Sequence, residues 1–419
     1  MNKKINFIDL FAGAGGLSEG FLDCGYTAIA HVEMNKDASD TLKTRACYYE
    51  LNGMGKGNVY KNYISGKITR DELYSSVRSE TLDKVINKVL SSETIDEVFN
   101  TIKVQMSKSQ TEVVDLIIGG PPCQAYSLIG RAVKNDNMEN DPRNFLYKLY
   151  GRFLDEFKPK VFIFENVPGL LSAKNGIYFE NMKTYFASLG YDLDFQILNA
   201  SDFQVLQNRR RVILIGWKKD LEFKYPVFEK KPSSFTVNEL LSDLPNLVPG
   251  ETKYNYKNHL TEYLRVTGIR KENDILIQHI SRTHNRNDID IYKYVIHQWN
   301  QNKKRVKYSE LPKNLLTHSN REVFLDRYKV VASDLSASQT IMAHIAKDGH
   351  YFIHPDLEQA RSISVREAAR LQSFPDDFYF EGSRTAMFTQ IGNAVPPLLS
   401  KEIAKSVRGI LIGGEDGEQ

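Results

Sequence analysis

Cysteines and long apolar segments are both scarce in this sequence. Only three of the 419 residues are cysteines, Cys24, Cys47 and Cys123, which is too few for a disulfide framework and fits a reducing compartment. No run of about 18 apolar residues occurs, which argues against a membrane-spanning helix. The first residues, MNKKINFIDLF, enter a strand-like run without the apolar stretch of a signal peptide. We therefore expect a cytoplasmic protein without a membrane partner.

A strong excess of one charge is also absent, because the formal net charge is only +3. The charges are unevenly distributed, however. Residues 226–350 hold 19 Lys and Arg against 14 Asp and Glu, together with seven of the nine histidines. A local basic excess is typical of a nucleic-acid-binding surface, although an ordinary solvated face can look the same.

Short apolar runs separated by helical stretches predict a doubly wound, mostly parallel α/β sheet. Residues 5–11 lead through a glycine-rich turn and a helical segment into a second apolar run, TAIAHVE. This strand–turn–helix–strand order opens many such folds. The remaining runs are of the kind buried in parallel sheets: strands are predicted at 113–119, 161–165 and 212–217, and helices at 144–157 and 176–189.

Changes in composition divide the chain further. Between about 52 and 110 lies a charged insert with apolar residues at helical spacing, interpreted as two or three amphipathic helices packed on the sheet without chemistry of their own. Short Tyr-, His- and Pro-containing pieces predict a smaller irregular domain over 226–360. Helical periodicity returns over 361–378, and a turn and a closing helix follow over 390–408. Residues 1–225 and 361–412 are therefore expected to form one domain.

The glycine-rich turn FAGAGG is the first candidate binding site. Gly13, Gly15 and Gly16 follow a strand and precede a helix, where they let the backbone approach a ligand closely. Glu33 ends the second strand, and a carboxylate there commonly bonds ribose hydroxyls. Ser18 replaces the third glycine of the dinucleotide pattern, which disfavours nicotinamide binding. A nucleoside cofactor without a pyrophosphate suits the turn better; tight packing alone is the other interpretation.

Cys123 is the candidate nucleophile. It follows predicted strand 113–119 in the string GGPPCQAYS, at the carboxyl end of a strand, where α/β enzymes build their sites. Attack requires the thiolate, so a nearby positive charge such as the arginines at 209–211 would be needed. A buried, inert cysteine is the alternative, which the two prolines and the polar Gln124 make less attractive.

Charged side chains also stand at two other strand ends. Glu165 ends the run FIFE and could donate a proton to a ring nitrogen; otherwise it is a surface residue that starts a turn. Arg209 and Arg211 alternate as they enter strand 212–217, which predicts that both face one side. There they could hold a phosphate or a carboxylate, although arginines on an edge strand can serve solubility alone.

Five short strings occur in one order along the chain. They are Gly-Pro-Pro-Cys-Gln, Glu-Asn-Val, Gln-x-Arg-x-Arg, Arg-Glu-x-x-Arg-Leu-Gln-x-Phe-Pro and Gly-Asn-Ala-Val-Pro-Pro. With this set the chain resembles the DNA (cytosine-5) methyltransferase family of bacterial restriction–modification systems, from residue 7 to about 408 except for the insert and the middle domain. The resemblance implies transfer of a methyl group from S-adenosylmethionine to carbon 5 of cytosine in a specific duplex sequence, with the base flipped out.

The resemblance also implies roles for individual residues. Cys123 would attack carbon 6, Glu165 would hold and protonate ring nitrogen 3, and Arg211 with Arg209 would support the base. The cofactor S-adenosyl-L-methionine would be bound by Phe11, Gly13, Gly15, Gly16, Leu17, Glu33, Met34, Asn393, Ala394 and Val395. The cytosine and the DNA would meet Pro121, Gln124, Ser127, Arg143 and Thr340. No metal is expected.

The resemblance also predicts the roles of two further segments. Residues 124–143, with Gly130 as a hinge, resemble the mobile lid that closes on flipped DNA. Arg366 and Glu367 would brace the recognition domain. The sequence departs from the family in the insert, where no acidic partner for the adenine amino group can be assigned, and before Gln207, where the usual Ile-Pro is missing. We expect a monomer acting on double-stranded DNA, with a restriction endonuclease as a separate partner.

Three other functions were weighed. A methyltransferase acting on amino groups would carry Asp-Pro-Pro-Tyr, where this chain has Pro-Pro-Cys. A transfer-RNA cytosine-5 methyltransferase of the same fold would share the catalytic strings, but usually has a smaller middle domain and a Cys-Phe-Thr string, which is absent. A non-catalytic nucleic-acid-binding module would be expected to have lost Cys123, Glu165 or the glycine turn. DNA methylation is therefore the preferred interpretation.

Overall fold

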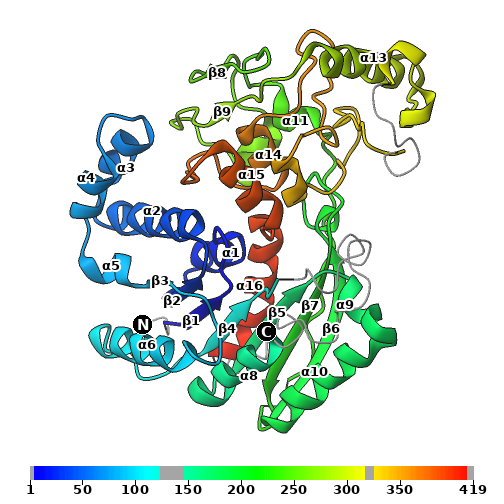
Figure 1. Ribbon diagram of the computed structural model, residues 1–419. Helices are drawn as coiled ribbons and strands as arrows, with labels where there is room; N and C mark the ends of the chain where they lie inside the picture. The colour runs from blue at the N-terminus through cyan, green and yellow to red at the C-terminus, as the bar shows by residue number, and fades with distance from the viewer. Residues whose placement is uncertain (1–3, 123–145, 222, 317–324, 413–419) are drawn as a thin grey trace.

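The computed structural model describes residues 4–122, 146–221, 223–316 and 325–412. Within them, seven strands form one sheet in the order β3-β2-β1-β4-β5-β7-β6 (Figure 1). Neighbours are parallel except for β7, which runs antiparallel to both β5 and β6. The predicted mostly parallel α/β sheet is confirmed. Its strands are β1 Asn6–Leu10, β2 Thr27–Glu33, β3 Val85–Asn87, β4 Leu116–Gly119, β5 Val161–Asn166, β6 Tyr191–Asn199 and β7 Arg210–Lys218.

Helices cover both faces of the sheet (Figure 1). Ile8 and Phe162 belong to the apolar core beneath α6, α8 and α10, whereas Phe7 and Ile163 face α1 and α16. Because adjacent residues of one strand are buried on opposite faces, the strands appear in the sequence as unbroken apolar runs. The helices are α1 Gly16–Asp23, α6 Ile95–Lys108, α8 Leu146–Phe157, α10 Ile177–Ser188 and α16 Pro397–Ile412, with the short α9 Gly169–Ser172 ahead of α10.

The insert contains more than two or three helices packed on the sheet. It holds α3 Gly57–Ile64, α4 Arg70–Ser75 and α5 Ser79–Asp83, then β3, then α6. β3 pairs with β2 and adds an edge strand that was not predicted. Only α6 matches the expected packing on the sheet. The apolar side chains of α3 and α4 instead meet α2 (Lys36–Gly53) and Ile277.

The described residues between 226 and 393 form a second lobe, drawn above the sheet in Figure 1. We call this part the second lobe, and the described residues up to 225 together with α16 the sheet lobe. The second lobe contains a two-stranded ribbon, β8 Thr252–Lys253 with β9 His279–Ile280. Its helices are α11 Asn238–Leu241, α12 Glu262–Thr267, α13 Arg286–Asn302, α14 Val365–Leu371 and α15 Arg384–Asn393.

The C-terminal part of the chain shares a core with the segment before it. Leu240, Ile341 and Val365 belong to one hydrophobic core; the domain boundary expected at residue 361 stays a prediction. Helix α14 ends at Leu371, shorter than the predicted 361–378, and α15 was not predicted. Helix α16 returns to the sheet lobe, where it packs on α1 (Figure 1). Across all described residues, we find no helix with the length and hydropathy needed to span a membrane.

Candidate active site

An ion pair lies where β5 ends and β7 begins, beside the carboxyl end of β4. Glu165 exposes only 9% of its surface, and its Oε1 lies 2.6 Å from Nε of Arg211. Arg211 reaches it because β7 runs antiparallel to β5 and begins where β5 ends. A Cβ on Gly120 would lie 2.5 Å from Glu165 Oε2, so a larger residue there would displace the carboxylate. The Glu165 carboxylate is thus paired with the Arg211 guanidinium through one oxygen, and its other oxygen lies against the backbone of Gly120.

The end of β5 is also tied to the segment that leads to Cys123. Asn166 Nδ2 donates to the carbonyl of the buried Pro121 across 3.1 Å. Below this point the Tyr150 hydroxyl lies 3.1 Å from the Ile117 carbonyl and 2.9 Å from that of Ile163, joining β4 to β5. Cys123, Gln124, Ser127, Arg143 and the possible hinge Gly130 lie outside the described residues, so the roles inferred for them stay predictions.

Arg209 is held at the start of β7 by backbone carbonyls, and the support that it is expected to give to the base stays a prediction. Its guanidinium is fully buried and donates to the carbonyls of Ile341, at 2.7 Å, and Gly392, at 3.1 Å. Because β7 begins at Arg210, strand alternation does not orient Arg209 together with Arg211. These contacts give Arg209 a bracing position between the start of β7, the second lobe and the end of α15.

Thr340 joins the same junction. Its hydroxyl donates to the carbonyl of Asn208 across 2.5 Å, and the amide of Asn208 donates to the Ser338 carbonyl across 2.9 Å. A pair of hydrogen bonds therefore links the second lobe to the chain that enters β7. The DNA contact inferred for Thr340 stays a prediction.

The glycine turn lies at the carboxyl ends of β1 and β2. The amide of Gly13 donates to Glu33 Oε2 across 2.8 Å, and the amide of Asn35 donates to Oε1 across 2.7 Å. Burial raises the pKa of Glu33, and these two donors oppose the rise. Gly13 and Gly15 have φ values of 55° and 87°, which favour glycine. Phe11, also predicted to bind the cofactor, has a positive φ of 56°.

The surroundings of this turn combine an open backbone with a carboxylate and an exposed apolar side chain. A Cβ built on Gly13 would meet nothing within 4 Å, so the backbone there is open. The Glu33 carboxylate borders that opening with acceptors suited to ribose hydroxyls, and Met34 exposes 62% of its surface next to it. The predicted residues thus offer a polar contact and an apolar one to the same ligand.

The turn after α15 closes this side of the site. A Cβ on Gly16 would collide with the carbonyl of Val395 and come within 2.9 Å of the Ala394 side chain. Glycine therefore allows the predicted residues of the two segments to lie in contact, while Asn393 is exposed beside them. Leu17 is different, because its side chain is packed in the core with α16 and only its backbone could meet a ligand.

Asn87 is a residue of this site that the sequence analysis missed. Its Nδ2 donates to the carbonyls of Glu33 and Met34, at 2.9 and 3.0 Å, and contacts Ser39 Oγ at 3.0 Å. It therefore holds the end of β2 that carries both predicted cofactor residues. The signal was the pairing of three-residue β3 with β2, which puts Asn87 opposite Glu33; so short a strand is hard to detect in a sequence.

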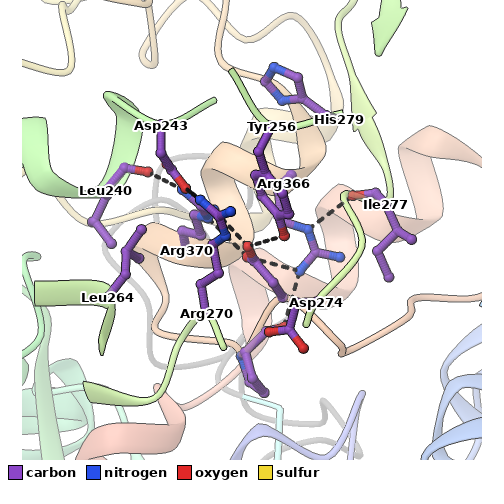
Figure 2. Close-up of polar contacts among 12 residues, drawn as sticks. Leu240, Asp243, Tyr256, Leu264, Arg270, Asp274, Ile277, His279, Arg366 and Arg370 are labelled. Carbon is purple, nitrogen blue, oxygen red and sulfur yellow. Dashed lines mark hydrogen bonds and ion pairs between the residues drawn. The ribbon is translucent and has the colours of Figure 1, made fainter. Parts of the chain in front are cut away.

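The bracing role expected of Arg366 and Glu367 agrees with their contacts. Arg366 donates to the carbonyls of Ile277, Pro375 and Phe378. Glu367 accepts two hydrogen bonds of 2.7 Å from Arg361, which holds the pKa of that carboxyl well below its usual range even though burial opposes this. Figure 2 shows Arg366 beside Arg370 in the interior of the second lobe.

Comparison with known proteins identifies the family. A family model described as C-5 cytosine-specific DNA methylase matches residues 5–60 and 69–409. Type II methyltransferase M.Bpa9945I of Bacillus paralicheniformis is 40% identical over 445 aligned residues, which cover 97% of this chain and 99% of that protein. Type II methyltransferase M.DdeI of Desulfomicrobium norvegicum is 31% identical, with 96% of this chain and 88% of that protein covered.

A solved structure supports the fold independently. An Escherichia coli protein described as a candidate DNA modification methyltransferase encoded within a prophage matches with a TM-score of 0.63. The match covers 97% of this chain and 99% of that one at 24% identity, which is evidence for the shared fold alone. With the family model matching both lobes and a relative similar over nearly its whole length, this chain belongs to the C-5 cytosine-specific DNA methylase family.

Proposed function

We propose that this protein transfers a methyl group from S-adenosylmethionine to carbon 5 of cytosine within a specific duplex DNA sequence, as the methyltransferase of a type II restriction–modification pair. The observation that carries the proposal is the position of Glu165. Its carboxyl group is buried at the end of β5 and is oriented by Arg211. The next residue, Asn166, is hydrogen-bonded to Pro121, which lies two residues before Cys123.

This arrangement suits a base that has left the duplex. Carbon 5 of cytosine is a weak nucleophile, and addition of the Cys123 thiolate to carbon 6 makes it a strong one. Glu165 supports that addition by giving a proton to ring nitrogen 3, so that the ring carries no added negative charge. Arg211 keeps the carboxyl group directed at the ring. The flipped base costs a few kcal/mol of lost pairing and stacking, which contacts between the second lobe and the DNA would offset.

The remaining steps return the enzyme to its starting state. When bound, S-adenosylmethionine supplies an electrophilic methyl group for carbon 5. Loss of the carbon-5 proton to a base, for which water suffices, reforms the ring double bond and expels the Cys123 thiolate. Nitrogen 3 returns its proton to Glu165. Glu33, held by the amides of Gly13 and Asn35, would bind the ribose hydroxyls throughout.

Trapping with 5-fluorocytosine tests the covalent route. Fluorine cannot leave carbon 5 as a cation, so the adduct between Cys123 and carbon 6 should persist after methyl transfer. We expect a protein–DNA band that survives denaturation and requires both S-adenosylmethionine and Cys123. The Cys123→Ala variant is the matched control. An enzyme active on ordinary cytosine in the same duplex but forming no such band would rule out Cys123 as the nucleophile.

Glu165→Gln tests the proton transfer. The amide keeps the size of the side chain but cannot give up a proton, so turnover should fall by about 10²–10⁴. Affinity for S-adenosylmethionine should stay near that of the wild type, because Glu165 is not among the residues at the ends of β1 and β2 that are predicted to bind the cofactor. Single-turnover methylation and calorimetric cofactor titration measure the two effects. A collapse of cofactor binding would instead make Glu165 a structural residue.

A further inference from the structure

Helix α3 of the insert contacts the second lobe. Tyr60, which exposes 2% of its surface, donates its hydroxyl to the carbonyl of Asp377 across 2.8 Å. Tyr63 donates to Glu381 Oε1 across 2.6 Å, and its ring lies edge-on to that of Tyr379 with centroids 5.4 Å apart. The three partners belong to residues 372–383, the segment between α14 and α15, which we call the connector. Two hydroxyl groups of one short helix are therefore directed at one segment of the other lobe.

The apolar side of α3 contacts a second segment of the same lobe. Tyr60 and Ile64 share a hydrophobic cluster with Leu51 of α2, Leu73 of α4 and Ile277 of the second lobe. Ile277 precedes β9 closely in the chain, and so lies far from the connector in sequence. Helix α3 thus touches two separate parts of the second lobe at once.

Both of these parts are bound by one buried arginine. Arg366 donates through Nε to the carbonyl of Ile277 at 3.1 Å and through a terminal nitrogen to that of Phe378 at 2.9 Å; the first of these bonds can be followed in Figure 2. A displacement of either segment would therefore be passed to α14 and to the interior of the second lobe. The contacts of α3 with the second lobe are therefore linked through Arg366 to the interior of that lobe.

Helix α2 makes a parallel link on the side of the glycine turn. Arg45 donates to Asp377 across 2.9 Å and to Glu19 of α1 across 3.1 Å. Lys271 of the second lobe also donates to Asp377, across 3.1 Å. The connector is consequently held by α2 and α3 together, and α1, which opens at the glycine turn, belongs to the same assembly.

We propose that Tyr60 and Tyr63 of α3 are positioning residues, which hold the second lobe in the orientation that presents DNA to Glu165 and Arg211. The insert then sets the affinity and the sequence fidelity of the enzyme for DNA, and leaves the chemical step unchanged. This inference rests on the proposed methylation of DNA. It gives the insert a role besides packing on the sheet.

The double variant Tyr60→Phe/Tyr63→Phe removes both hydroxyls and keeps both rings in the apolar cluster. The substrate is a duplex with the sequence that bisulfite sequencing finds methylated in expressing cells. We expect KM for DNA to rise roughly fivefold or more, since two inter-lobe hydrogen bonds no longer favour the competent orientation. The turnover number should stay within about twofold and S-adenosylmethionine affinity should not change. Methylation of single-mismatch sites should rise relative to the cognate site.

Tyr191→Phe is the matched control, because the hydroxyl of this buried tyrosine donates to the Pro159 carbonyl across 2.8 Å within the sheet lobe. It should leave KM for DNA unchanged. Hydrogen exchange, which needs no turnover, should quicken at 271–277 and 372–383 in the double variant only. Wild-type KM with unchanged exchange would overturn the inference, as would a loss of turnover that merely follows a lowered Tm. An inactive wild type that still shows the exchange difference would count against the proposed function instead.

Discussion

The two lobes are held together by different interactions. In the sheet lobe, backbone groups pair along the strands, and the two cores between sheet and helices are built mainly of apolar side chains. The interior of the second lobe includes three fully buried arginines, Arg361, Arg366 and Arg370, which donate to backbone carbonyls and to carboxylates. Irregular backbone leaves many carbonyls without a partner, and a guanidinium with five donors can satisfy several of them.

The comparison shows what a lobe with little regular structure requires. Arg370 of α14 reaches the Leu240 carbonyl and Asp243 (Figure 2). It also reaches Asp376, so one side chain joins α14 to two other segments. Such a network gives a defined shape without a sheet, but each member depends on the charge of the others. We therefore expect the second lobe to be the more sensitive to protonation and to loss of charge, and the sheet lobe to be the more tolerant.

Acid should produce the largest difference in stability between the lobes, because it should destabilise the second lobe more than the sheet lobe. Burial lowers the pKa of His279 and His350 to about 4 and of His354 to about 3, from 6.5. The unfolded chain binds these protons at higher pH, so their contribution is complete above pH 6.5 and is lost as the pH falls toward 4. Between pH 7.5 and 5 each costs at most about 2 kcal/mol, and the three together at most about 6 kcal/mol.

The two tryptophans allow this to be measured lobe by lobe, because Trp217 lies in β7 and Trp299 in α13. Denaturant unfolding at pH 7.5 and 5 would be followed by Trp299 fluorescence in a Trp217→Phe variant and by Trp217 fluorescence in a Trp299→Phe variant. Equal losses of stability for both reporters would contradict the comparison.

Loss of one buried charge should have the next largest effect. Arg370→Met removes the guanidinium that Asp243 and Asp376 share. Asp243 keeps Arg270, and Asp376 keeps the Tyr256 hydroxyl. Breaking these buried pairs should lower the free energy of unfolding by about 3–5 kcal/mol. The exposed Arg265, paired with Glu262, is the control; its replacement by Met should cost less than about 0.5 kcal/mol. Urea unfolding measures both. A small loss for Arg370→Met would mean that the network adds little stability.

A cavity in the sheet lobe should have the smallest effect. Ile163 of β5 is fully buried between the sheet and its helices. Ile163→Val removes one methylene and leaves no charge behind, so we expect a loss of about 0.5–1.5 kcal/mol, read from Trp217 fluorescence during unfolding. A loss as large as that of Arg370→Met would remove the proposed difference between the lobes.

The sequence could predict those features whose signal lies in neighbouring residues. The β1–α1–β2 unit, the strands of continuous apolar residues and the position of Glu165 at a strand end depend on neighbouring residues, and the structure has them as expected. β6 was missed because it is an edge strand whose charged and apolar residues alternate, unlike the buried runs. β3 was missed because three residues carry almost no pattern.

The rest depends on contacts between distant segments. Nothing near Arg209 in the sequence shows that the Ile341 and Gly392 carbonyls lie within its reach. Likewise, α3 has an amphipathic pattern that fits packing on a sheet as well as it fits packing on another lobe. The family resemblance identified the chemistry, but these two roles became visible only from the fold.

The return of α16 to α1 has a consequence for the order in which the protein is made. Gly20 of α1 leaves no room for a side chain beside Ser400 and Lys401, and Gly16 none beside Val395. On the ribosome these partners of α1 emerge after the whole second lobe. A nascent chain can therefore form the Glu165–Arg211 pair early, yet it lacks one wall of the cofactor cradle until translation has passed residue 395. The cofactor side of the site therefore contains the first strand to be synthesised, yet it is the last part of the site to be completed.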